Sequence, residues 1–300
     1  MLQAVGVPAL LALASHHGPV QEDLPSLDQF DHMLVFVPGR QANQFVDCTD
    51  KGGDAAQALP LGLAGRRALV LEAQNPRFAT IPEYPADASK IEDQRHLRLV
   101  DLSDVVVDET LTLTGVHAAY LRGFLLEVPT SSRRTVFQRQ TGLADVELSE
   151  FSADALETPY APLRLHCVYT LKRQFHRSKG GLSGILRAGI ERLYLTADPV
   201  ENRLTPFEVT IPLQILSSVS LAVPEGFVAE ALSSSSSKPD PRFAACQSHF
   251  RIDGKQVNLE FQCIMPTGKF GPADYAAYRG TMDQALSMLE KEVTLKSSAH

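Results

Sequence analysis

One histidine and one aspartate, fifteen positions apart, give the strongest chemical signal in this sequence. His32 opens the apolar run HMLVFV at residues 32–37, and Asp47 lies near the end of a second run at residues 44–48. The turn-forming segment PGRQAN between the two runs predicts an antiparallel hairpin. With the hairpin centred between Gly39 and Arg40, His32 and Asp47 face each other on one side of the sheet, about 5 Å apart.

A carboxylate beside an imidazole is useful for proton transfer. When it accepts one ring N–H it fixes the tautomer, and the other ring nitrogen can take a proton from a nucleophile. His32 is therefore the candidate general base and acid, and Asp47 the residue that orients it. A cysteine enzyme of this kind also needs a thiol, best placed at a helix N-terminus, where the dipole lowers its pKa. No cysteine precedes His32 in the sequence.

The four cysteines do not supply the missing thiol on sequence grounds. Cys48 adjoins Asp47, but strand alternation turns it to the opposite face, so we expect an inert, buried thiol. Cys48, Cys167, Cys246 and Cys263 show no CxxC or paired spacing, and we expect neither a zinc site nor a disulfide framework. Cysteine usage leaves the redox compartment open.

The other polar motifs are weaker. His16, His17 and Asp23 could be drawn as metal ligands, but their spacing is not that of a known site, and a solvated loop is the better interpretation. The glycine-rich KGGLSG at residues 179–184 lacks the pattern of a phosphate-binding loop and predicts a hairpin turn. His166 and His176 are expected to be ordinary histidines of a strand. We expect no cofactor and no metal.

Composition narrows the classes of partner. The chain has 300 residues, is 44% hydrophobic and carries a net charge of −7. A nucleic-acid partner is disfavoured, because affinity for phosphates comes from clustered Lys and Arg. No apolar run is long enough for a spanning helix, and no secretion signal opens the chain.

The pattern of the chain predicts a mixed architecture. The opening MLQAVG is typical of the last turns of a helix, which suggests a truncated start, and the proline-rich segment within residues 54–90 is a candidate domain boundary. The serine run at 233–237 is given no role. We expect two helices within 116–140, separated at Pro129, and an amphipathic helix at 272–291 that packs on the core. Strands are expected at 7–14, 32–37, 44–48, 68–71, 97–113, 163–175, 207–215, 218–223, 243–252 and 256–264, with 185–195 ambiguous.

The segments PSLDQFDHMLVFV, FVDCTDKGG and LPLGLAGRRALVL resemble the catalytic core of the transglutaminase-like superfamily. Within it they are similar to the bacterial branch that carries β-rich domains of unknown function around the core. The resemblance covers about residues 1–85 well and implies a papain-like fold with catalytic residues in the order Cys, His, Asp. His32 and Asp47 match the second and third. The family's cysteine opens the helix whose tail MLQAVG resembles, which would place it upstream of Met1. Asp31 stands where the family commonly has Asn, and strand alternation points it away from the imidazole.

Together these observations predict an α+β protein. Residues 1–90 would form the C-terminal half of a papain-like, transglutaminase-like core. Residues 91–300 would form a β-sandwich-like region with a helical insert and a C-terminal helix, with a division into two sub-domains near 176–205 left open.

Two functions stay open. The first is the C-terminal portion of a cysteine enzyme for acyl transfer or amide hydrolysis on protein or peptide substrates, inactive alone for want of its nucleophile. The alternative is a non-catalytic binding or scaffold protein that uses the β-rich region. Family members with this arrangement commonly belong to the bacterial envelope, while the localisation and oligomeric state of this chain stay open.

Overall fold

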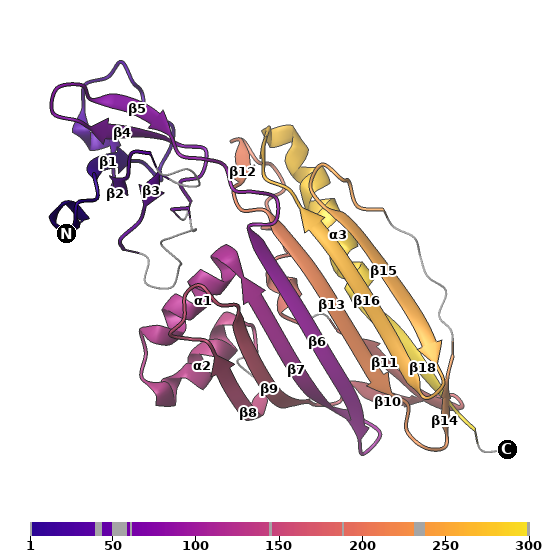
Figure 1. Ribbon diagram of the computed structural model, residues 1–300. Coiled ribbons are helices and arrows are strands. Elements are labelled where there is room, and N and C mark those ends of the chain that lie inside the picture. The colour runs from indigo at the N-terminus through magenta and orange to yellow at the C-terminus, as the bar shows by residue number, and fades with distance from the viewer. Residues whose placement is uncertain are drawn as a thin grey trace.

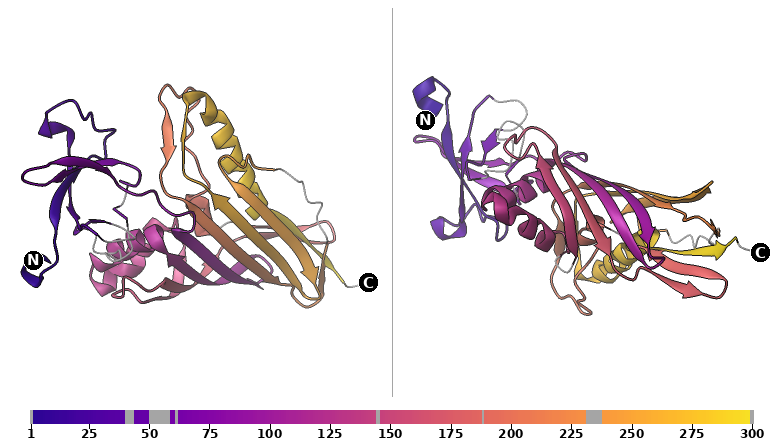
Figure 2. Two further views of the ribbon diagram at one scale, coloured as in Figure 1. Left: turned by 45° about the horizontal axis from the view of Figure 1, so that its top comes forward. Right: turned by 90° about the horizontal axis from the view of Figure 1, so that it is seen from below.

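The computed structural model describes residues 2–39, 44–49, 59–60, 62–143, 146–187, 189–230 and 238–298. It is a strand-rich α/β structure with several sheets. Figures 1 and 2 show a small sheet at the N-terminal end and a much larger sheet beside it, with the C-terminus at the far end of the molecule. No helix in the described part of the chain is long and apolar enough to cross a membrane.

The small sheet is antiparallel throughout, in the strand order β3-β2-β1-β4-β5. Its strands are β1 (Leu10–Ala14), β2 (His32–Phe36), β3 (Phe45–Val46), β4 (Arg67–Leu71) and β5 (Arg77–Thr80). Two short 3-10 helices, η1 (Leu2–Val5) and η2 (Leu27–Gln29), accompany it. The opening residues are thus helical, as the sequence indicates, but in the tighter 3-10 form. Strand β5 was not predicted, because the prolines around it read as a linker.

One face of the small sheet carries its core, since buried and more exposed residues alternate along β1, β2 and β4. Although the run at residues 32–37 is apolar throughout, only one face of it is buried: Leu34 and Phe36 are buried, but Met33 is 54% exposed. His32 lies on the same side of β2 as Leu34 and Phe36, at the edge of this core. The core consists of Ala12, Ala14, Leu34, Phe36, Phe45, Leu63, Ala68, Val70 and Ile81.

The larger sheet has seven strands in the order β15-β16-β13-β6-β7-β9-β8. Neighbours are antiparallel except β13 and β6, which are parallel. In chain order the strands are β6 (Ser89–Val100), β7 (Asp104–Thr114), β8 (Glu147–Asp154), β9 (Leu163–Leu171), β13 (Leu213–Ala222), β15 (Ala245–Asp253) and β16 (Gln256–Met265).

A four-stranded sheet, β10-β11-β18-β14, shares one hydrophobic core with the seven-stranded sheet. Its strands are β10 (Phe175–Ser178), β11 (Gly181–Leu186), β14 (Phe227–Ala229) and β18 (Lys291–Ser297), and β12 (Phe207–Val209) pairs separately with β17 (Gly268–Phe270). Figure 1 places β10, β11 and β18 behind the long strands. The β-rich region predicted for residues 91–300 thus contains these two sheets around a common core.

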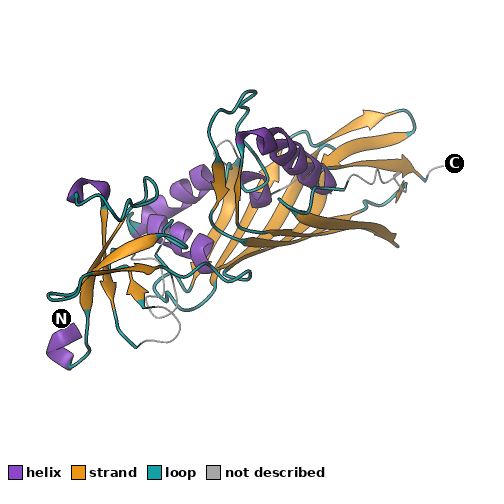
Figure 3. Cartoon of the chain, turned by 90° about the horizontal axis from the view of Figure 1, so that it is seen from above, coloured by secondary structure: helices purple, strands orange, loops and turns teal. Residues whose placement is uncertain are grey.

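Helices interrupt and cover these sheets as the sequence indicates (Figure 3). The helical insert between β7 and β8 is α1 (Gly115–Leu126) followed by α2 (Thr130–Gln140), with Pro129 at the N-cap of the second helix. Gly115 begins α1 at φ +67°, where a Cβ would strike the carbonyl oxygen of Ala88.

The expected amphipathic helix near the C-terminus is present. It is α3 (Tyr275–Leu289), preceded by η4 (Pro272–Asp274), and its Met282 and Leu289 belong to the core; η3 (Ile190–Leu193) is a further short 3-10 helix. It is not the last element, because β18 follows it and joins the four-stranded sheet.

Candidate site at the His32–Asp47 pair

His32 and Asp47 are hydrogen bonded. The distance between Nε2 of His32 and Oδ2 of Asp47 is 2.9 Å, and their side chains are 18% and 11% exposed. With Nε2 engaged, Nδ1 of His32 is the nitrogen left to exchange a proton with a reactant. The structure therefore brings together the two residues singled out in the sequence.

The pairing arises from a register different from the predicted one. Val35 pairs with Val46 and Phe36 with Phe45, so the hairpin is centred one residue further along the chain than we expected. Asp47, just beyond the end of β3, follows this register to the position opposite Leu34, diagonal to His32. Because this moves each pairing by two residues, the side chains keep their faces. The predicted face is right and the predicted direct opposition is wrong.

The Asp47 carboxylate is held by its neighbours in the anionic form. Burial by itself raises the pKa of Asp47, but hydrogen bonds from Thr49 and His32 outweigh it, and the net pKa lies below the ordinary value. Thr49 donates to Oδ1 from both its hydroxyl, at 2.7 Å, and its backbone N–H, at 2.8 Å. Thr49 thus occupies one carboxylate oxygen and leaves Oδ2 for the imidazole.

Two further residues at this site were not predicted to belong to it. The ring of His16 lies edge-on to that of His32, with centroids 4.9 Å apart, and its backbone N–H and Nδ1 contact Asp31 at 3.0 and 3.2 Å. Nε2 of the exposed His17 lies 3.1 Å from the same carboxylate. Asp31 thus binds His16 and His17 and not His32, as strand alternation indicates.

The signal for this cluster was available in the sequence. Strand β1 ends at Ala14, which pairs with His32 at the start of β2. The residues that follow β1, His16 and His17, must therefore lie near Asp31, which precedes β2. The sequence prediction considered only Asp23 as their partner. The hydrogen bond from the His16 backbone is the main reason that the pKa of Asp31 lies below its ordinary value.

None of the chain's cysteines makes a thiol–imidazole pair with His32. Cys48 is free and, contrary to expectation, exposed; it makes no hydrogen bond within the described residues. Cys167 is buried, and burial followed by the nearby Glu109 carboxylate raises the pKa of its thiol far above the usual range. A nucleophilic thiol needs a lowered pKa and access to a substrate, and Cys167 has neither.

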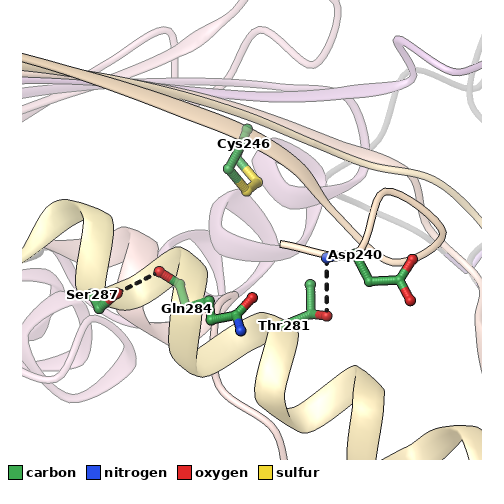
Figure 4. The surroundings of a disulfide bond; sticks show 6 residues. Asp240, Cys246, Thr281, Gln284 and Ser287 are labelled. Atoms are coloured by element: carbon green, nitrogen blue, oxygen red, sulfur yellow. Dashed lines mark hydrogen bonds between the residues drawn. A yellow bond between two sulfur atoms is a disulfide. The ribbon is translucent and has the colours of Figure 1, made fainter. Parts of the chain in front are cut away.

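The other two cysteines correct a prediction. Cys246 and Cys263 form a disulfide between directly paired positions of β15 and β16, where no disulfide was expected. Figure 4 shows it on the side of the sheet that faces α3, above Gln284 and Thr281.

The remaining sequence motifs have structural roles. The glycine-rich segment forms the β10–β11 hairpin turn, with Gly180 at φ +86°. His176 is exposed on β10, and His166 on β9 pairs with Asp108 of β7 at 3.0 Å. No group of three potential ligands that could hold a metal ion occurs among the described residues.

Comparison with known proteins adds no relative. No protein-family model matches the chain, and no curated protein sequence matches it significantly.

Proposed function

We propose that His32 and Asp47 are the base and the orienting carboxylate of a thiol acyl-transfer or amide-hydrolysis site, and that residues 1–90 are part of a papain-like, transglutaminase-like core. The observation that carries this proposal is the 2.9 Å bond from Nε2 to a carboxylate that Thr49 keeps anionic. It fixes the ring so that Nδ1 can act on a thiol. The substrate class that follows is a protein or peptide amide.

The chemistry of such a site defines what is missing from it. A thiol gives its proton to Nδ1 of His32, and the thiolate attacks the amide carbonyl. The imidazolium then protonates the departing amine, and an amine or water resolves the acyl intermediate. Cys48 makes no bond to His32, Cys167 is buried, and the other two cysteines are oxidised. We therefore expect the 300-residue chain to be inactive on amides by itself.

The test is to supply the thiol. Thiolysis of an activated aryl ester by a small aromatic thiol is measured with and without the protein. A positioned general base contributes roughly 10²–10⁴-fold, and a freely diffusing thiol should gain near the lower end of this range. We expect His32→Ala to abolish the gain and Asp47→Asn to reduce it.

The chain contains a matched control. His166 forms a similar bond to Asp108, but on an exposed outer surface, with side chains 36% and 56% exposed. His166→Ala should leave the gain unchanged. Equal rates for His32→Ala and wild type would refute the catalytic role. Hydrolysis of a peptide amide by the chain without added thiol, lost in His32→Ala, would refute its inactivity.

A second candidate function is ligand binding by the β-rich region without catalysis. The observation in its favour is a cavity beneath the seven-stranded sheet, lined in part by buried charged and polar side chains. It does not depend on His32, so His32→Ala would leave binding there intact. The ligand class that suits this cavity follows from its lining.

A further inference from the structure

The inner face of the seven-stranded sheet carries charges where a core is normally apolar. Along β7 every second residue from Val105 to Leu113 is buried and apolar except Glu109, which is 4% exposed. Next to it on β6, Asp93 and Arg95 are also buried, and Arg95 pairs directly with Glu109 in the strand register. Burying an unpaired charge costs free energy. The partners of each group therefore determine whether the cluster can accept a charged ligand.

Arg95 has partners on every side of its guanidinium. Its Nε lies 2.9 Å from Asp93, its Nη1 donates to the carbonyl oxygen of Arg187 at 2.6 Å, and its Nη2 lies 3.4 Å from Glu191 and 3.5 Å from the Ser217 hydroxyl. These contacts use all three nitrogens of the guanidinium. The contact of Nε with Asp93 is an ion pair without a hydrogen bond, so Arg95 is held by the charge of its own cluster and by three weaker or single hydrogen bonds.

The two acids around Arg95 divide their roles. Burial and the adjacent Glu191 carboxylate raise the pKa of Asp93 well above its ordinary value, which favours the neutral acid. For Glu191, burial acts in the same direction, but Arg95 and the hydrogen bonds of Ser217 and Asp93 outweigh it and lower its pKa. Glu191 is therefore the anion closest to Arg95, and Glu109, which faces Arg95 in the strand register without forming a salt bridge, adds a further carboxyl group to this single guanidinium.

Glu109 and Tyr169 have unused hydrogen-bonding capacity. Glu109 forms no ion pair within the described part of the chain, and its recorded partner is the weak donor Cys167, at 3.5 Å. The hydroxyl of Tyr169, on the neighbouring strand β9, makes no hydrogen bond to any described residue although Tyr169 is 3% exposed. Both side chains line one cavity of about 150 Å³.

The rest of the cavity is mainly apolar. Strand β7 contributes Val107, the end of α2 contributes Phe137, and η3 contributes Ile190. Three arginines also line it: Arg95 lies in the charged cluster described above, Arg192 pairs with Glu290 at 3.0 Å, and Nε of Arg187 donates to Gln174 at 3.1 Å. The charged cluster has three carboxyl groups, those of Asp93, Glu191 and Glu109, around the one guanidinium of Arg95. With the Tyr169 hydroxyl and mainly apolar walls beside it, this excess of acid favours a cation with an apolar body.

We propose that this cavity binds a small organic amine, whose protonated amino group pairs with Glu109 and contacts the Tyr169 hydroxyl while its apolar body fills the space between β7, α2 and η3. A cavity of this volume holds a molecule about the size of a substituted benzene. An anionic ligand is disfavoured, because the Glu109 carboxylate in the lining repels it.

The test compares three probes of matched shape: benzylamine, benzyl alcohol and benzoate. Affinities for the wild-type chain are measured by calorimetry near neutral pH. We expect benzylamine to bind about ten- to a hundredfold more tightly than benzyl alcohol, as a hydrogen bond to a charged group predicts. Benzoate should be the weakest. Benzoate binding as tightly as benzylamine, or none of the three binding, would overturn the proposal.

Variants locate the binding and separate it from the His32 site. Glu109→Gln should remove the preference for the amine, and Tyr169→Phe should weaken the binding of benzylamine and benzyl alcohol. Asp108→Asn is the matched control, because Asp108 precedes Glu109 on β7 but is bonded to His166 on the outer surface. Neither it nor His32→Ala should change the affinity. If Glu109→Gln does not fold, the order of the three probes with the wild type still decides.

Discussion

Removing the Cys246–Cys263 disulfide should destabilise the β-rich region by an amount that follows from its position in the fold. It joins directly paired residues of β15 and β16, seventeen positions apart. In the chain-entropy model, closing a loop of about 18 residues restricts the unfolded chain and stabilises the folded one by roughly 3 kcal/mol at 25 °C. We expect this loss of unfolding free energy in the double variant Cys246→Ala/Cys263→Ala.

The loss is measurable by thermal unfolding. A change of 1 kcal/mol shifts Tm by roughly 2–4 °C for a domain of this size, so the variant should melt about 6–12 °C lower. Cys48→Ala is the matched control, since Cys48 is exposed and free, and it should melt with the wild type. A reductant should lower the Tm of the wild type without changing that of the double variant.

Counting thiols tests the bond itself. In denaturant without reductant, the wild-type chain should react with two equivalents of a thiol reagent, at Cys48 and Cys167. Four equivalents, or a reductant-insensitive Tm, would refute the reasoning. Disulfides form and persist mainly in oxidising compartments, so the two-thiol result would also bear on the conditions under which the chain folds.

The remaining predictions concern buried ionisable groups. Because the folded-state pKa of Asp47 is lowered, its stabilisation is present above pH 3.8 and lost as the pH falls through the folded value. Asp47→Asn should therefore cost about 2 kcal/mol at pH 7 and progressively less in acid, measured by urea unfolding against pH; a pH-independent cost would contradict this. The pKa of Asp93 is raised, so its contribution is present below pH 3.8 and lost as the pH rises. Asp93→Asn should therefore gain stability relative to the wild type between pH 4 and neutrality, and an opposite trend would show that Asp93 is ionised in the fold. Arg95→Met leaves Glu191 without its cation and should cost about 3–5 kcal/mol at pH 7, whereas an unchanged urea midpoint would show that Arg95 does not balance it.

The pairing of His32 with Asp47 could be predicted from the sequence only in part. Both strands and their shared face followed from alternation around a turn, but alternation fixes only odd or even register, and the pairing came out two residues away. The same argument applied to the expected strands 243–252 and 256–264, around the turn at Gly254, pairs Cys246 with Cys263. The disulfide was missed because cysteine spacing was compared with sequence motifs and not with the strand register.

The buried cluster around Arg95 was hidden for a different reason. Glu109, Asp93 and Arg95 stand at alternate positions in β-branched and polar runs, where charged residues normally mark the solvent side. Which face of the sheet meets solvent depends on what covers the other face. Here the segment around Glu191, nearly a hundred residues after Arg95 in the chain, covers part of it. Local sequence carries no information about that contact.

Burial distinguishes the His32–Asp47 pair from the His166–Asp108 pair more clearly than their geometry does. His32–Asp47 and His166–Asp108 have nearly equal distances, 2.9 and 3.0 Å. An exposed pair is screened by water and orients its ring weakly. In the first pair the exposed fractions are half those of the second or less, Thr49 fixes the second carboxylate oxygen, and a further imidazole lies against the ring. These features give His32 the defined orientation that proton transfer requires, and His166 is the control that isolates them.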